Sequence, residues 1–214
     1  MLKRCVILLM CVFGLPAAAE DDVNAVIKGV EAAYTDVKTL RADFVQVTRS
    51  AAMGDETRQR GRVTLKRPRM MRWEFTQPAG NTFVTNGEQM WVWSAAEKQV
   101  VVSKAGAAGG QGMAQLLDDL NRLGELFDAT MGDNASHPNS VVLALTPKAE
   151  AGFQRLTLRL AAKDYSVQNV VMVDAFGNEV SLSFNQVKNN LEIADDQFTF
   201  TIPAGATVLN ADGP

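Results

Sequence analysis

The chain has 214 residues, of which 47% are hydrophobic and 21% are charged, and its formal net charge is −3. This composition is typical of a folded protein with an apolar core and excludes a chain that is disordered throughout. The negative net charge disfavours electrostatic binding of nucleic acid. We expect one domain, because a second domain of ordinary size would have to share this length.

The N-terminal 19 residues have the pattern of a secretory signal peptide. Two basic residues precede an apolar run over residues 5–15, and the alanines at 17–19 form an A-x-A cleavage site. We therefore expect residues 1–19 to be a signal peptide, residues 20–214 to be a single mature domain, and the mature protein to be periplasmic. Both cysteines lie within this leader, so no disulfide or thiolate site is expected in the mature chain.

The first element expected in the mature chain is an amphipathic helix from Val23 to Leu40. Its apolar residues recur at helical spacing and share one face. They are Val23, Val26, Ile27, Val30, Tyr34, Val37 and Leu40. Such a helix has one apolar stripe to bury against another element.

After this helix the hydrophobic period changes to that of strands. Strands are expected over residues 44–48, 60–66, 70–76, 82–85, 90–93 and 99–103. The pair Asn86-Gly87 predicts a hairpin turn. Within residues 70–76, alternation places Met71, Trp73 and Phe75 on one face of the strand.

The second half of the chain predicts one more helix and five more strands. A glycine-rich loop over residues 105–112 is expected to act as a hinge before an apolar helical stripe from Met113 to Phe127. The expected strands cover residues 141–146, 153–160, 167–173, 180–187 and 198–202. Together the elements predict an α+β fold, in which an antiparallel meander curls into a half-barrel and the helices cover its concave face.

The inventory of reactive side chains argues against an enzyme. The only histidine, His137, lies in a polar loop, so a histidine-based triad or a histidine-rich metal site lacks its parts. The glycines of residues 106–112 match neither a P-loop nor a dinucleotide-binding fingerprint. We therefore expect no catalytic residue, no metal and no cofactor.

A basic stretch runs from Arg58 to Arg72 without an acidic residue. One interpretation is the solvated face of a strand, because Arg58, Arg60, Arg62 and Lys66 recur at a period of two. The other is a basic rim that meets anionic headgroups or an acidic partner. The sequence leaves both open.

Methionine and tryptophan side chains are concentrated in the middle of the chain, between Met70 and Met131. Such side chains can line an adaptable surface that accepts apolar ligands, and they can equally form an ordinary core. The strand at residues 90–93 is bulky on both faces, so both of its faces should be covered.

Several motifs, in this order and spacing, resemble the LolA family of periplasmic carriers of outer-membrane lipoproteins. They are Gly61-Arg62-Val63-Thr64-Leu65-Lys66-Arg67-Pro68, Arg72-Trp73-Glu74-Phe75-Thr76-Gln77-Pro78, Asn86-Gly87 ahead of Met90-Trp91, Leu145-Thr146-Pro147-Lys148, the turn from Asp174 to Gly177, and Phe198-Thr199-Phe200-Thr201-Ile202-Pro203-Ala204-Gly205. The resemblance implies an unclosed antiparallel β-barrel with a helical lid over a hydrophobic cavity, which agrees with the expected elements.

The resemblance also implies roles for particular residues. Arg67, in the Arg-Pro step, would be the latch that holds the lid closed by hydrogen bonds to lid backbone. The acyl-binding cavity would be lined by Met71, Trp73, Phe75, Phe83, Trp91, Trp93, Leu116 and Leu120. The protein would be a chaperone that binds the acyl chains of lipoproteins and does not bind nucleic acid.

Family membership further implies that lipoproteins arrive from an inner-membrane ABC transporter and pass to an outer-membrane acceptor, LolB-like where one is present. We expect a monomer. The alternative is a carrier or sensor of other amphiphiles in the envelope, such as a glycolipid or phospholipid.

Overall fold

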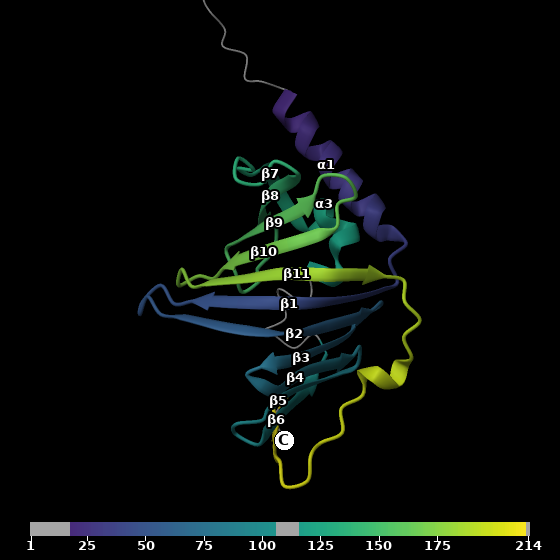
Figure 1. Cartoon of the computed structure of the whole chain (residues 1–214), viewed down its shortest axis with the longest axis vertical. Coiled ribbons are helices and arrows are strands. Elements are labelled where there is room, and N and C mark those ends of the chain that lie inside the picture. Colours follow the sequence, from purple (N-terminus) through teal and green to yellow (C-terminus); the bar gives the residue numbers. More distant parts are fainter. Residues whose placement is uncertain (1–17, 106–115, 213–214) are drawn as a thin grey trace, which may run out of the picture.

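The structure is a computed structural model that describes residues 18–105 and 116–212. Most of the expected signal peptide (residues 1–17) and most of the expected glycine-rich loop (residues 106–115) lie outside the described residues. One twelve-stranded sheet forms the molecule, in the order β12-β6-β5-β4-β3-β2-β1-β11-β10-β9-β8-β7 (Figure 1). Its strand pairs are antiparallel, except that β12 runs parallel to β6.

The helical elements are α1 (Ala18–Thr35), η1 (Leu120–Arg122), α3 (Leu123–Leu126) and η2 (Asp195–Phe198). The strands are β1 (Thr39–Arg49), β2 (Glu56–Lys66), β3 (Met70–Gln77), β4 (Ala79–Asn86), β5 (Gln89–Ser94), β6 (Gln99–Lys104), β7 (Phe127–Met131), β8 (Ser140–Pro147), β9 (Arg155–Ala161), β10 (Val167–Val173), β11 (Glu179–Asn189) and β12 (Thr207–Asn210).

The sheet is joined in its middle by the pairing of β1 with β11, two strands far apart in sequence. Phe44 of β1 pairs with Phe184 of β11 and, on its other side, with Gly61 of β2. The meander therefore consists of two halves that meet at β1, which local alternation in the sequence could not predict.

The described chain bears out an unclosed, mostly antiparallel sheet with few helices. The first helix begins earlier and ends earlier than expected, so placing Leu40 in it was wrong. Leu40, Ala42 and Phe44 are all buried at a period of two, which is the period of a strand that buries one face. Leu40 matched the helical stripe because it follows Tyr34 and Val37 at spacings of three, although Val37 also lies beyond the helix end at Thr35.

The second expected helix is shorter than its apolar stripe. Residues 116–118 are helical, η1 and α3 follow, and β7 begins at Phe127. Phe127 pairs with Pro147 of β8, so its buried ring belongs to the sheet. The helical spacing of the leucines continues to Leu126, directly before β7. The sequence pattern therefore gave no sign of where the strand begins, and β7 was not predicted.

The C-terminal prediction of a strand over residues 198–202 was wrong. Residues 195–198 form η2, and Phe198 is fully buried in it. The chain then runs across the sheet and adds β12 at the edge, where Val208 pairs with Val100. An apolar residue at every second position, as in 198–202, also arises when an extended segment packs on a sheet without joining it.

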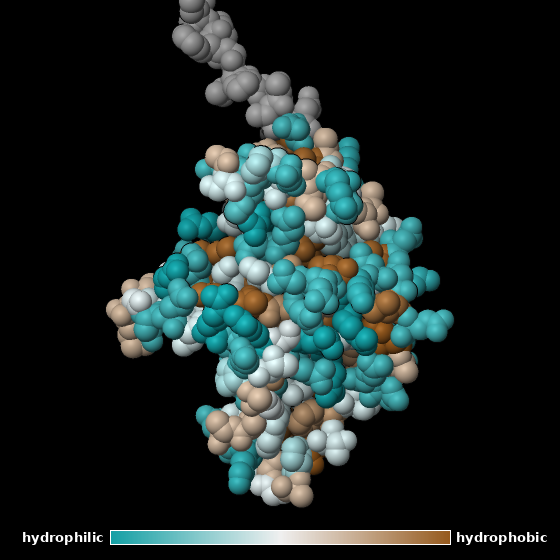
Figure 2. Space-filling model, viewed as in Figure 1, coloured by the Kyte–Doolittle hydropathy of each residue, from teal (hydrophilic) through white to brown (hydrophobic). Residues whose placement is uncertain are grey.

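The two faces of the sheet have different coverings. α1 and residues 116–126 lie over the inner, concave face (Figure 1), and the buried stripe of α1 and the leucines of the second segment join one apolar cluster with the inner-face side chains. Hydrophilic side chains dominate the surface seen in Figure 2, with apolar side chains visible between them. Within the described residues, no helix is both long enough and apolar enough to span a membrane.

Candidate functional site

Four aromatic rings form the floor of the inner face. The rings of Phe44 and Trp73 meet edge to face with centroids 4.9 Å apart, and Phe44 meets Phe75 in the same way at 5.3 Å. Phe83 of β4 pairs with Trp73 of β3 and so adds its ring to the same face. Trp73 is buried, while Phe75 and Phe83 are half-buried and pack against the cluster.

Gly61 makes this floor possible. A Cβ atom at this position would overlap the backbone oxygen of Glu74 and would lie 2.8 Å from the ring of Phe44. We expect Gly61→Ala to push Phe44 off the floor and to lower the free energy of unfolding by about 1–3 kcal/mol, as overpacking does. Urea denaturation measures this change, and an unchanged midpoint would show that the strand absorbs the methyl group.

Above the floor, the lid residues are fully packed. Leu116, Leu117, Leu120 and Leu123 are each at most 2% exposed and belong to the same cluster as Met71 and Trp73. The structure therefore brings six of the predicted cavity residues together: Met71, Trp73, Phe75, Phe83, Leu116 and Leu120. In this closed arrangement the lid leucines pack over the inner face of the sheet.

Arg67 ties the lid to the sheet. It follows β2, and its Nη1 donates to the carbonyl oxygens of Tyr34 at 2.6 Å and Val37 at 2.8 Å, while Nη2 donates to that of Leu117 at 3.2 Å. The last carbonyls of a helix lack partners inside the helix and carry partial negative charge, so a cation is favoured there. The last turn of α1 has no basic residue of its own. One guanidinium therefore holds the end of α1 and the second lid segment at once.

Asp118 is the counter-ion of this latch. Its Oδ1 lies 3.4 Å from Nε of Arg67, and its Oδ2 accepts a hydrogen bond from the backbone N–H of Arg69 at 3.2 Å. The side chains of Arg67 and Asp118 are only 15% and 14% exposed. Burial raises the pKa of Asp118 despite the attraction of Arg67, and burial likewise lowers the pKa of Arg67.

The raised pKa of Asp118 predicts a pH dependence of stability. The folded chain binds a proton at Asp118 more readily than the unfolded chain, so this group's contribution is full below its unfolded pKa and is lost as pH rises through the folded pKa. Asp118→Asn should therefore gain stability relative to the parent chain as the pH rises above the ordinary aspartate pKa of about 4, as followed by urea denaturation at each pH. A relative loss as the pH rises would mean that attraction to Arg67 outweighs burial.

A second tie joins the two lid segments directly. Oε1 of Glu31 in α1 accepts a hydrogen bond from the backbone N–H of Gly124 in α3 at 2.9 Å, and Nζ of Lys148 donates to the Gly124 carbonyl at 2.6 Å. The sequence predicted neither this tie nor the role of Asp118. Helical spacing places Asp118 opposite the apolar stripe and so predicts a solvated carboxylate, which is wrong because its side chain is only 14% exposed.

Comparison with known families identifies this arrangement. The family profile described as outer membrane lipoprotein carrier protein LolA matches residues 35–201, which is most of the chain. The chain belongs to the LolA family. The match includes the aromatic floor, Arg67, Asp118 and the lid segment before β7.

Curated relatives agree with the LolA assignment over most of their length. The outer-membrane lipoprotein carrier protein of Dechloromonas aromatica is 31% identical over 175 residues, covering 81% of this chain and 82% of that protein. That of Chromobacterium violaceum is 28% identical and covers 93% of each.

Solved structures support the fold. An uncharacterized conserved protein from Thermus thermophilus superposes with a TM-score of 0.56 at 18% identity, covering 88% of this chain and 99% of its own. A DUF1329 family protein from Desulfovibrio piger reaches a TM-score of 0.52 at 13% identity, covering 83% and 96% of the two chains.

The strand register corrects two of the cavity residues suggested by the LolA resemblance. Trp91 pairs with Val84, and Trp93 pairs with Thr82, whereas the inner-face Phe83 pairs with Val92. Because side chains alternate along a strand, both tryptophans lie on the outer face. There Trp93 packs against Phe200 of the C-terminal segment, with ring centroids 6.3 Å apart. The C-terminal segment thus packs against the outer face of this strand, whereas Val92 on its inner face is 41% exposed, so the expectation that both faces are covered was wrong at Val92.

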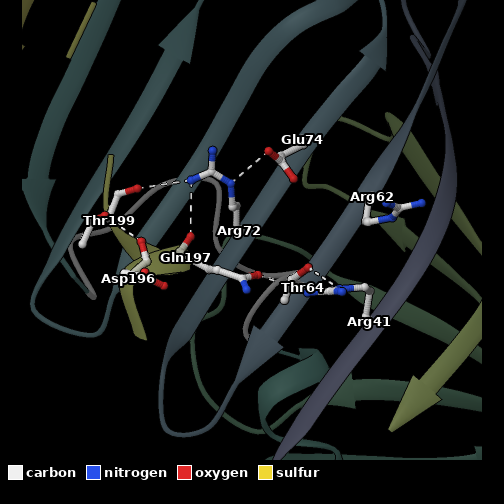
Figure 3. A pocket seen from close by; sticks show the side chains of 8 residues that line it. All are labelled: Arg41, Arg62, Thr64, Arg72, Glu74, Asp196, Gln197 and Thr199. Carbon is white, nitrogen blue, oxygen red and sulfur yellow. Dashed lines mark hydrogen bonds and ion pairs between the residues drawn. The ribbon is translucent and has the colours of Figure 1, made fainter. Parts of the chain in front are cut away.

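The basic stretch has a further use in this LolA family member. A groove of about 500 Å³ lies on the outer face. The side chains that line it, drawn in Figure 3, are Arg41, Arg62, Thr64, Arg72, Glu74, Asp196, Gln197 and Thr199. Arg72 Nη1 donates to the carbonyls of Gln197 at 3.3 Å and Thr199 at 3.2 Å, and Arg41 Nη2 donates to Oε1 of Gln197 at 3.1 Å. Arg72 of the basic stretch and Arg41 of β1 thus fasten the C-terminal segment to the outer face of the sheet, a use of Arg72 that neither interpretation of the stretch included.

Proposed function

We propose that this protein binds the acyl chains of lipoproteins between the inner face of its sheet and the lid, and that it carries them through the periplasm without covalent chemistry. The observation that carries the proposal is the latch: one arginine holds two lid segments over an apolar face through backbone carbonyls. Relatives named as outer-membrane lipoprotein carrier proteins support it.

The chemistry of the cargo requires such a shelter. Exposing a lipid chain to water costs about 0.8 kcal/mol for each methylene, so an anchor of two or three chains costs tens of kcal/mol. A carrier must also give the chains up, and a lid held by a few hydrogen bonds provides a state that can open. In this proposal Arg67 is the latch, and the cavity residues are Met71, Trp73, Phe75, Phe83, Leu116 and Leu120.

We further propose that residues 1–19 are a cleaved signal peptide and that residues 20–214 act as one domain and as a monomer. Lipoproteins would be loaded by an inner-membrane lipoprotein-releasing ABC transporter and delivered to an outer-membrane acceptor. Loading needs the lid to open, because the lid leucines are buried in the closed arrangement, and delivery ends with the lid closed again.

Depletion of the protein in its native host tests this function. We expect lipoproteins to accumulate at the inner membrane, as measured by membrane fractionation, and complementation with the intact gene to restore their sorting. Native mass spectrometry of the protein purified from the periplasm should then show bound species with the mass of lipoproteins. Normal sorting after depletion would contradict the proposal.

A further inference from the structure

Two hydrogen-bonding groups are buried on the inner face without a partner. Nε1 of Trp73 and Oγ of Ser103 have no hydrogen-bond partner among the described residues. Trp73 is 6% exposed and Ser103 is 3% exposed. Buried polar groups in native proteins are nearly always hydrogen-bonded, because an unmatched group loses its bonds to water and gains none. Two such groups on one face therefore require an explanation.

The strand register places both groups on the same inner surface. Trp73 of β3 pairs with Phe83 of β4, and Phe83 pairs with Val92 of β5. Val92 pairs in turn with Val101 of β6, and Ser103 lies two residues further along β6, on the same face. At about 4.8 Å for each of the three strand spacings, the two strands are about 14 Å apart. The unpaired groups therefore mark two separate points along one apolar surface.

The indole of Trp73 finds no acceptor among the described residues. The ring that meets it edge to face, that of Phe44, is a hydrocarbon. An indole N–H is a donor only, so it calls for an acceptor and cannot bind a cation. A serine hydroxyl can donate as well. Both groups can thus donate a hydrogen bond to an uncharged oxygen atom of an apolar ligand that binds to the inner face.

We propose that Trp73 Nε1–H and Ser103 Oγ–H are two separate hydrogen-bond donors on the inner face, each of which can bind a carbonyl oxygen of an acyl chain of the cargo. This inference rests on the proposed function and adds a polar recognition element to it. An acyl chain is joined through an ester or amide carbonyl, which also loses its water when it enters an apolar cavity. A donor placed on the cavity floor supplies the missing hydrogen bond and satisfies both groups.

The two donors predict discrimination between acyl and alkyl chains. A site built to hydrogen-bond a ligand group rejects an analogue that lacks the group, because its own buried polar atoms then stay unpaired. The probes are two synthetic lipopeptides with glyceryl-cysteine anchors of equal chain length, one with ester-linked and one with ether-linked chains. We expect the protein to bind the ester probe about tenfold more tightly, the effect of about one matched buried hydrogen bond.

Three variants locate the effect. Trp73→Phe keeps an aromatic ring and removes the donor, so it should lower the ester-to-ether affinity ratio toward one. Ser103→Ala should lower the same ratio, and it should leave the melting temperature of the cargo-free chain unchanged or higher, because it removes an unpaired hydroxyl. The matched control is Trp93→Phe on the outer face, which should keep the parent ratio.

The outcomes separate this inference from the proposed function. Equal affinity of the parent chain for both probes, or a ratio that is the same in Trp73→Phe and Ser103→Ala as in the parent, would overturn the role of the two donors while leaving an acyl carrier intact. Failure of the parent chain to bind either probe would overturn the carrier proposal and the role of the two donors together.

Discussion

Replacing Arg67 by leucine is expected to open the lid and to make the protein hold its cargo longer. The substitution removes the three side-chain hydrogen bonds to the Tyr34, Val37 and Leu117 carbonyls and leaves Asp118 without its counter-ion. In the proposed cycle these contacts are lost when the lid opens to admit cargo, so removing them should shift the population toward the open arrangement. In that cycle closure of the lid displaces the acyl chains, so delivery to an acceptor should slow.

The same substitution should lower stability. Breaking a fully buried charge pair costs about 3–5 kcal/mol, and the partial exposure of this pair reduces the expected loss in the free energy of unfolding to about 2–4 kcal/mol. Hydrogen exchange should accelerate at the amides of residues 116–126. A reconstituted transfer assay measures delivery, with Arg58→Leu as the control, because Arg58 is an exposed arginine on β2. Equal transfer by Arg67→Leu and the parent chain would refute the latch.

Hydrophobic periodicity predicted a strand well where apolar residues occupy one of its faces and polar residues the other. Met71, Trp73 and Phe75 alternate with polar residues, and the structure places all three on the inner face. The family resemblance was wrong where it overrode this alternation. It placed Trp91 and Trp93 in the cavity, but their register puts both on the outer face, where the C-terminal segment packs against Trp93.

The site was predictable only in part, for a physical reason. Arg67 entered through a sequence motif, and the structure adds its acceptors, which are backbone atoms that carry no sequence signal. Asp118 and Glu31 each bind a partner on another element: Arg67, which follows β2, and Gly124 of α3. These contacts depend on how the elements pack, which local sequence does not encode. The pairing of β1 with β11 is likewise a long-range contact that no local pattern encodes.

Shortening Leu120 is expected to weaken the cargo-free protein and to strengthen its grip on acyl chains. Leu120 is fully buried in the cluster that includes Met71 and Trp73, so Leu120→Ala should lower the free energy of unfolding of the cargo-free chain by about 2–5 kcal/mol. In the proposed loaded state the lid is displaced and acyl chains take the place of its leucines. The truncation then costs the loaded state less than the empty one.

Leu120→Ala should raise cargo affinity by the amount that it destabilises the empty protein more than the loaded one. Each 1.4 kcal/mol of that difference should raise cargo affinity about tenfold. Titration with an acylated lipopeptide measures it, and Leu209→Ala, which shortens an exposed leucine on the edge strand β12, should leave the affinity unchanged. A lower affinity for Leu120→Ala would mean that the contacts of Leu120 with cargo in the loaded state outweigh the packing that Leu120 makes in the empty state. A higher affinity would show that the lid leucines and the acyl chains compete for the same inner face.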